Sequence, residues 1–262
     1  MPGLPARPRP HRDLRAQGRA PGRGRALRGV RRDPGAHAGV GAVTAPASTS
    51  WTGQTGEPTR LLLLRHGQTE LSVGRRYSGH GDPELTALGH AQAAGAAVRL
   101  ARIGAEITAI VSSPLRRARQ TAATVAEATN APLEVREGLI ETDFGSWEGL
   151  TFGEAKQRDP ELHALWLGSQ DVAPPGGESF AQVSERIATE RDAILAAYGG
   201  GTVVVVSHVT PIKMLLRDAL GAGPEILYRM HLDLASLSEV AYYPDGGTSV
   251  RLVNDTSHHP AG

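Results

Sequence analysis

Residues 61 to 67 read Leu61-Leu62-Leu63-Leu64-Arg65-His66-Gly67, a continuous apolar run that ends abruptly in charged and polar residues. An apolar run without polar alternation is typical of a strand buried on both faces, as in a parallel sheet covered by helices. Its polar residues then lie at the carboxyl end of the strand, where open α/β sheets bind their ligands. This stretch therefore predicts both a buried sheet and the place of a binding site.

Strand and helix patterns alternate along the rest of the chain. Further strands are predicted near 107–112, 133–135, 202–207, 237–243 and 248–253, and the turn at 244–247 joins the last two as a hairpin. Helices are predicted near 86–102, 113–128, 151–167, 179–198 and 211–220, with Thr86 as one N-cap and Ser113-Pro114 starting the second helix. This order predicts an α/β three-layer sandwich, with a mostly parallel central sheet, helices on both faces and an antiparallel edge.

Basic residues follow three of the predicted strands. Arg65 and His66 follow the first, Arg116 and Arg117 lie in the helix after the second, and His208 follows the strand at 202–207. Arginine offers a planar fork that matches phosphate oxygens, and the start of the helix at 113–128 adds the positive end of its dipole. An imidazole in line with phosphorus can act as a covalent nucleophile. The three strand ends therefore predict a site for a phosphate ester.

Motifs extend from this first signature through the chain. After Arg65-His66-Gly67-Gln68-Thr69-Glu70, five blocks follow in order: Tyr77-Ser78-Gly79, Leu85-Thr86-Ala87-Leu88-Gly89, Ser112-Ser113-Pro114-Leu115-Arg116-Arg117-Ala118, Glu141-Thr142-Asp143-Phe144-Gly145-Ser146-Trp147-Glu148-Gly149 and Val206-Ser207-His208. Together they resemble the histidine phosphatase superfamily, which includes phosphoglycerate mutases and many small phosphatases. The resemblance covers residues 60 to about 254 and implies the family's fold and phosphoryl chemistry.

The resemblance assigns expected roles to nine residues. It implies that His66 is the nucleophile and that Glu141 donates a proton to the leaving group. Three further residues would hold the phosphoryl group, namely Arg65, Arg117 and His208. Positions matched to the family predict substrate contacts from Gln68, Ser72, Ser78 and Gly79. No metal ion and no organic cofactor is implied, because the cationic side chains supply the electrostatic stabilisation.

Several of these assignments have neighbouring alternatives. Arg117 is preferred to Arg116 because the family's arginine directly precedes the alanine matched by Ala118. Asp143 and Glu148 lie close to Glu141 in sequence, and either could serve as the acid. His208 could cap the following helix rather than contact a phosphate.

A closer resemblance comes from the segments 68–73, 139–145, 172–180 and 207–216. They are similar to the acid phosphatase domain of actinobacterial bifunctional ribonuclease H and acid phosphatase proteins, which is related to α-ribazole phosphatases. No ribonuclease H domain is expected in this chain, because residues 1–59 contain only Asp13, Asp33 and Glu57 as acids. The predicted function is hydrolysis of a small phosphorylated metabolite, a phosphomonoester, through a phosphohistidine on His66.

Three other functions remain open at this point. A phosphoglycerate mutase would use the same residues, although Leu71 and Ser72 stand where mutases usually place Trp and Asn. A non-catalytic module that binds phosphate esters belongs to a different class. Nucleic-acid binding through a basic tail is the third, and it is disfavoured because no aromatic residue interleaves the arginines before Trp51.

Composition divides the chain near residue 60. Residues 1–60 carry eleven Arg and three acids, whereas residues 61–262 carry seventeen Lys plus Arg and twenty-four Asp plus Glu. We expect a disordered Arg/Pro/Gly-rich tail at 1–59, a phosphatase domain at 60–254 and a flexible C-terminus at 255–262. The sequence contains no Cys and no apolar run long enough for a membrane span, which is typical of a cytoplasmic protein without membrane contact.

Overall fold

The computed structural model describes residues 53–103 and 106–259, and these ranges fold around one sheet. The elements are β1 (Thr59–Arg65), α1 (Glu70–Val73), α2 (Ala87–Ala101), β2 (Ala109–Ser112), α3 (Arg116–Thr129), β3 (Leu133–Val135), the 3-10 helices η1 (Glu137–Leu139) and η2 (Gly145–Trp147), α4 (Phe152–Arg158), α5 (Pro160–Gly168), α6 (Phe180–Ala197), β4 (Thr202–Ser207), α7 (Val209–Ala219), α8 (Ile226–Arg229), β5 (Leu237–Tyr242) and β6 (Thr248–Asp255). Most of the predicted tail, residues 1–52, lies outside the described residues, and so does the proposed nucleic-acid contact of that tail.

Six strands form the sheet in the order β3-β2-β4-β1-β5-β6. β3, β2, β4 and β1 are parallel, whereas β5 runs antiparallel to β1 and β6 runs antiparallel to β5. The predicted α/β sandwich with an antiparallel edge is therefore confirmed. Because β1 lies beside β4 in register, with Arg65 opposite Ser207, the residues that follow these two strands emerge next to each other.

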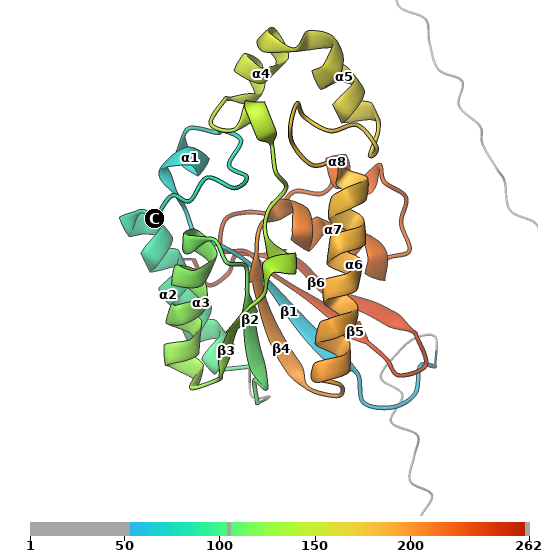
Figure 1. The fold of residues 1–262 in the computed structure, drawn as a ribbon. Helices are drawn as coiled ribbons and strands as arrows, with labels where there is room; N and C mark the ends of the chain where they lie inside the picture. The colour runs from blue at the N-terminus through green and yellow to red at the C-terminus, as the bar shows by residue number, and fades with distance from the viewer. Residues whose placement is uncertain (1–52, 104–105, 260–262) are drawn as a thin grey trace, which may run out of the picture. The chain divides into compact units, whose positions relative to one another are not determined.

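The leucines of β1 point alternately into two cores. Leu61 and Leu63 pack with residues of α6 and α7, whereas Leu62 and Leu64 pack with residues of α2 and α3. Figure 1 shows these two pairs of helices on opposite sides of the sheet. Every leucine of the run is fully buried, which explains why the strand shows no polar alternation.

α2 begins after Thr86, whose hydroxyl accepts a hydrogen bond from Gly89 N–H as predicted. The starts of α3 and α7 differ from their predictions. α3 begins at Arg116 rather than at Pro114. The hydroxyl of Ser113 is bonded to His208 and accepts from Leu115 N–H, which precedes the first residue of α3, so it does not cap that helix. α7 begins two residues before Pro211, which is tolerated because the first helical turn leaves its N–H groups unbonded.

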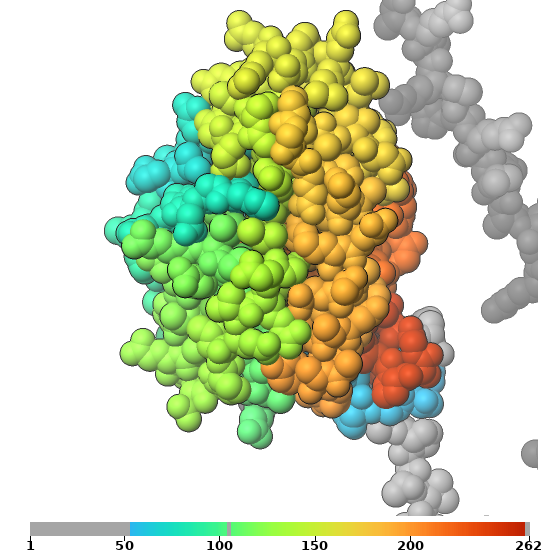
Figure 2. Space-filling model, viewed as in Figure 1, coloured from blue at the N-terminus to red at the C-terminus, as the bar shows by residue number. Residues whose placement is uncertain are grey.

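α4 and α5 stand beyond the carboxyl ends of the parallel strands (Figure 1). Capping boxes start α4 at Thr151 and α6 at Ser179. Ser or Thr followed three residues later by Glu or Gln favours this motif. The space-filling view shows the yellow region of α5 above the orange region of α6 (Figure 2). The rings of Trp166 from α5 and Phe180 from α6 are in contact. These two helices therefore provide one wall over the sheet edge.

The ends of the described chain also contact this body. Gln54 and Thr55 hydrogen-bond to the β5–β6 hairpin, and His258 bonds to the carbonyl of Ala235. β6 extends through Asp255, one residue into the segment predicted to be flexible, and residues 260–262 lie outside the described residues. Among residues 53–103 and 106–259, every helix is too short or too polar to span a bilayer.

Candidate active site

A cavity of about 900 Å³ opens at the carboxyl ends of β1 and β4. Of the nine predicted site residues, five line it: Arg65, His66, Ser72, Ser78 and Glu141. Arg117 and His208 do not line the cavity but lie close behind it. The ring of His208 lies against the ring of His66, and the charge of Arg117 acts on His66. Gln68 and Gly79 are not part of its wall. Seven of the nine predicted residues therefore line this cavity or lie directly behind it.

The imidazole of His66 is held in one orientation. Its Nδ1 lies 2.7 Å from the carbonyl oxygen of Gly67. Because a carbonyl oxygen can only accept a hydrogen bond, Nδ1 carries the proton and Nε2 keeps a free electron pair. Burial, followed by the positive charges of Arg117 and Arg65, lowers the pKa of His66 well below its usual value. The ring is therefore neutral and able to act as a nucleophile.

His208 is fully buried and lies against His66, with the ring centroids 5.1 Å apart. Its Nε2 is 2.7 Å from the hydroxyl of Ser113, at the end of β2. His208 occupies the N-cap position of α7, but its side chain does not cap the helix. Burial and the nearby Arg117 lower the pKa of His208, so this ring is neutral as well.

Two guanidinium groups bring positive charge to the imidazoles. Arg65 donates to the carbonyl of Leu232, and burial lowers its pKa to about 10. Arg117 donates to three carbonyls of one loop, those of Ser78, Gly79 and Gly81. Within the described part of the chain neither guanidinium has an ion-pair partner within 4.0 Å, so each can still neutralise an anion.

Arg116 contrasts with its neighbour Arg117. It is exposed and forms an ion pair with Glu84, whereas Arg117 is buried. The helical rotation of about 100° per residue turns these two consecutive side chains to different faces of α3. The structure therefore places Arg117, and not Arg116, beside the two imidazoles.

Among the three acids considered for the proton donor, Glu141 alone lines the cavity. Its carboxylate accepts a hydrogen bond from its neighbour's backbone, Thr142 N–H, at 2.8 Å. Asp143 caps Gly145 N–H, and both oxygens of Glu148 hold the backbone of the loop at 79–81. Those two carboxylates are thus occupied by structural hydrogen bonds outside the cavity.

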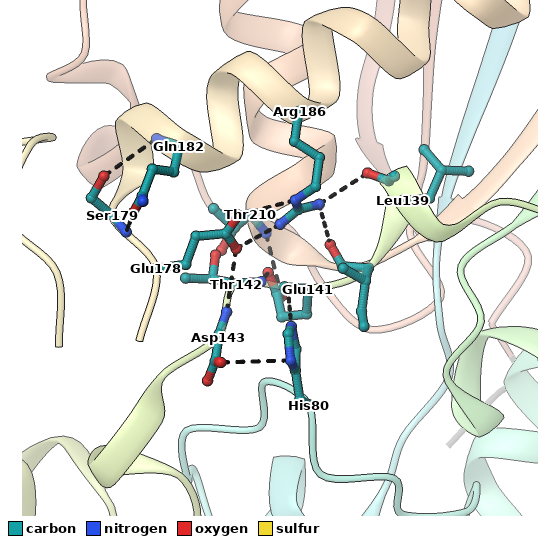
Figure 3. A network of polar contacts seen from close by, with 12 residues as sticks. His80, Leu139, Glu141, Thr142, Asp143, Glu178, Ser179, Gln182, Arg186 and Thr210 are labelled. Atoms are coloured by element: carbon teal, nitrogen blue, oxygen red, sulfur yellow. Dashed lines mark hydrogen bonds and ion pairs between the residues drawn. The ribbon is translucent and has the colours of Figure 1, made fainter. Parts of the chain in front are cut away.

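A polar network from α6 supports the segment that carries Glu141 (Figure 3). Arg186 donates to the carbonyls of Gly138 and Ile140 at 2.9 and 2.8 Å. The same guanidinium forms two parallel hydrogen bonds with Glu178, whose carboxylate also accepts from Asp143 N–H at 3.4 Å. One arginine therefore fixes the backbone on the amino-terminal side of Glu141, and its partner acid contacts the backbone two residues beyond it.

The four predicted substrate contacts have different surroundings. Ser72 Oγ accepts from Thr69 N–H within the capping box of α1, and Ser78 Oγ is buried without a hydrogen-bond partner among the described residues. The side chain of Gln68 accepts from the hydroxyl of Thr86 at the start of α2. Gly79 is packed against the carbonyl of Thr142, which would lie 2.4 Å from an added Cβ, so only glycine fits there.

Several residues of the cavity were missed from the sequence. Thr210 and Lys213 line it from α7, at two and five positions after His208, which a helical projection of that segment could have indicated. Six aromatic residues also line it, and they are considered below. Within residues 53–103 and 106–259, no group of three His, Cys, Asp or Glu side chains is arranged to hold a metal ion.

Comparison with known proteins identifies similar chains. A family model described as the histidine phosphatase superfamily (branch 1) matches residues 61–256. A bifunctional protein of Mycobacterium tuberculosis is 59% identical over 217 residues, which are 83% of this chain and 59% of that protein. This chain therefore spans less than two thirds of the length of its mycobacterial relative.

Solved structures show a similar fold. Mycobacterial glucosyl-3-phosphoglycerate phosphatase superposes with a TM-score of 0.68 at 31% identity, over 75% of this chain and 99% of that one. The α-ribazole phosphatase of Shigella flexneri superposes with a TM-score of 0.67 at 28% identity, over 76% and 97% of the two chains.

Proposed function

The chain belongs to the histidine phosphatase superfamily, as its motif blocks predicted, and from this premise we propose that it hydrolyses a small phosphomonoester through a phosphohistidine on His66. The observation that carries the proposal is the hydrogen bond from His66 Nδ1 to Gly67 O. It leaves the electron pair of Nε2 free beside two arginines that pair with no carboxylate among residues 53–103 and 106–259.

The first chemical step transfers the phosphoryl group to the enzyme. His66 Nε2 forms a bond to phosphorus while the bond from phosphorus to the ester oxygen breaks. Glu141 gives its proton to the departing oxygen, which leaves as a neutral alcohol. Arg65, Arg117 and His208 stabilise the negative charge on the remaining phosphoryl oxygens.

The second step returns the enzyme to its starting state. Water attacks phosphorus, the bond from nitrogen to phosphorus breaks, and the Glu141 carboxylate takes the proton of the water. The products are inorganic phosphate and the free alcohol. Each residue ends in the protonation state in which it began.

We propose further that the enzyme is of the acid phosphatase or α-ribazole phosphatase type. A nucleophilic imidazole must be neutral, and one of ordinary pKa would be protonated below pH of about 6.5. The lowered pKa of His66, caused by burial and by Arg117 and Arg65, keeps the ring neutral in more acidic solution. This supports turnover at acidic pH.

Replacement of the nucleophile tests the function. We expect His66→Ala to lower kcat by about 10³-fold or more, because the variant lacks the nitrogen that attacks phosphorus. With ³²P-labelled substrate, wild-type enzyme quenched in alkaline detergent should carry a base-stable, acid-labile label that His66→Ala lacks. Near-ultraviolet circular dichroism controls for the fold of the variant.

Two outcomes would contradict the proposal. One is retained hydrolysis by pure, folded His66→Ala protein. The other is isomerisation of phosphoglycerate in a coupled assay primed with bisphosphoglycerate at a rate above that of hydrolysis, which would make the protein a mutase.

A further inference from the structure

The far part of the cavity is lined by aromatic rings. The chain contains eleven Trp, Tyr and Phe residues, and six of them line this one cavity: Tyr77, Phe144, Phe152, Trp166, Phe180 and Tyr228. All three Phe of the chain are among them. Such a concentration in a chain poor in aromatics indicates a site that accepts an apolar, flat group.

These rings form one connected surface. Tyr77 contacts Phe152 edge to face at 4.7 Å and Trp166 at 5.8 Å, measured between ring centroids. Trp166 in turn contacts Phe180 at 5.0 Å, and Phe180 contacts Tyr228 at 6.1 Å. The rings come from α4, α5, α6, α8, the loop after α1 and the segment between η1 and η2, so the fold brings them together from distant parts of the sequence.

Part of this surface is exposed rather than buried in a core. Phe152 is 59% exposed and Tyr228 is 44% exposed, while Trp166 and Phe180 are buried at the base. A contiguous apolar surface beside a polar reaction site is costly in water unless a ligand covers it. The hydroxyls of the two tyrosines are already engaged, because Tyr77 OH is bonded to His163 and Tyr228 OH to the carbonyl of Trp166, so these residues present their rings to the cavity.

One donor of this surface has no acceptor. The indole N–H of Trp166 is buried and unpartnered among residues 53–103 and 106–259. By contrast, the indole N–H of Trp147 donates to Asp159 at 2.7 Å. A buried N–H without an acceptor is destabilising, and a ligand acceptor that reaches it would remove this cost.

We propose that the alcohol part of the substrate carries an aromatic ring with a hydrogen-bond acceptor, and that this ring binds among these six residues with the acceptor at Trp166 Nε1. This inference rests on the proposed phosphatase function. His66 and Arg65 line the same cavity, so one molecule spans both parts when a few bonds separate its phosphate from its ring.

Matched substrates test the ring. We expect 2-phenylethyl phosphate to be hydrolysed with a kcat/KM about tenfold or more above that of butyl phosphate, because only the former places a ring on the aromatic surface. Phe152→Ala should reduce this ratio. Leu165→Ala is the matched control, because Leu165 is 60% exposed on α5 and does not line the cavity. Equal kcat/KM values for the two esters in wild-type enzyme would overturn the inference while leaving the phosphatase function intact.

A second pair of substrates tests the acceptor. We expect 2-(2-pyridyl)ethyl phosphate to exceed 2-phenylethyl phosphate in kcat/KM by about tenfold, because its ring nitrogen accepts the bond from Trp166. Trp166→Phe keeps a ring and removes the N–H, so it should abolish this difference but keep the preference over butyl phosphate. An undiminished pyridyl preference in Trp166→Phe would overturn the assigned contact. Failure to hydrolyse any of these esters, together with no phosphohistidine, would instead overturn the phosphatase function.

Discussion

Three physical effects act on the single imidazole of His66. Burial removes the water that would stabilise its protonated form, and two nearby guanidinium groups repel a second proton. The hydrogen bond to Gly67 O acts in the opposite direction but is the smallest of these influences. The net result is a neutral ring whose tautomer is fixed by a backbone carbonyl.

Nitrogen NMR of the imidazoles can check this state. In protein labelled with ¹⁵N at histidine, we expect His66 to stay neutral from pH 7.5 to 5.5 and to show Nδ1 protonated and Nε2 unprotonated. The urea-unfolded chain is the control, since its histidines titrate near pH of about 6.5. A folded-state midpoint near that value, or a proton on Nε2, would contradict the assignment.

The closeness of Arg65, His66 and His208 was predictable because each lies at the end of a strand or directly after it. Arg65 ends β1, and His66 and His208 follow β1 and β4, whose pairing is encoded in continuous apolar runs. Their partners were not predictable. Arg117, for example, is held by backbone carbonyls of residues 78–81, and carbonyls carry no residue-specific signal in a sequence.

At the scale of elements, a side chain of α6 is hydrogen-bonded to the backbone of the segment that carries Glu141. The guanidinium of Arg186 bridges two carbonyls of that segment and one carboxylate of the loop before α6. Lysine cannot make these contacts at once, because its ammonium lacks the planar fork. Arg186 is therefore a positioning residue for the proposed proton donor.

Leaving groups of different basicity can reveal this positioning. We expect Arg186→Lys to lower kcat/KM for butyl phosphate by about tenfold or more, because kcat/KM reports the first step, in which an alkoxide must be protonated as it leaves. The kcat/KM for p-nitrophenyl phosphate should change by less than about twofold, because nitrophenolate leaves without a proton. Arg191→Lys is the control, since Arg191 also lies on α6 but pairs with Asp192 and Asp218. An equal loss with both substrates would show a merely structural role.

Elements were predicted well where a periodic pattern decides them and less well where tertiary contacts do. The long helix α6 and the hairpin of β5 and β6 agree with their patterns. The predicted start of α3 was wrong, because the hydroxyl of Ser113 is bonded to His208, which follows β4, and to Leu115 N–H, and the helix begins only at Arg116. The aromatic surface was not foreseen, since its residues lie in separate segments that share no motif.

For the molecule as a whole, the buried histidines link stability to pH. The folded-state pKa values of His66 and His208 are lowered, mainly by burial, whereas unfolded histidines titrate near pH of about 6.5. Below that pH the unfolded chain binds protons that the folded chain excludes. The free energy of unfolding must therefore fall as pH falls through this range.

Urea unfolding at two pH values measures this linkage. We expect each of the two histidines to remove about 1 kcal/mol of stability between pH 7.5 and 5.5. The double variant His66→Gln with His208→Gln should lose correspondingly less over the same interval. Phosphate must be absent from the buffer, because an anion bound to the folded state would add its own stabilisation. The same loss in wild type and double variant would contradict the linkage.

The position of β1 between β4 and β5 has a consequence for biosynthesis. The proposed nucleophile follows β1, the first strand of the described residues, but both neighbours of β1 come late in the sequence, and Arg65 finds its carbonyl partner 167 residues further along the chain. His66 therefore lacks its supporting strands until most of the described residues have been synthesised. We expect the proposed hydrolytic activity to arise in one late step, when β4 and β5 pair with β1, and not to grow gradually with chain length.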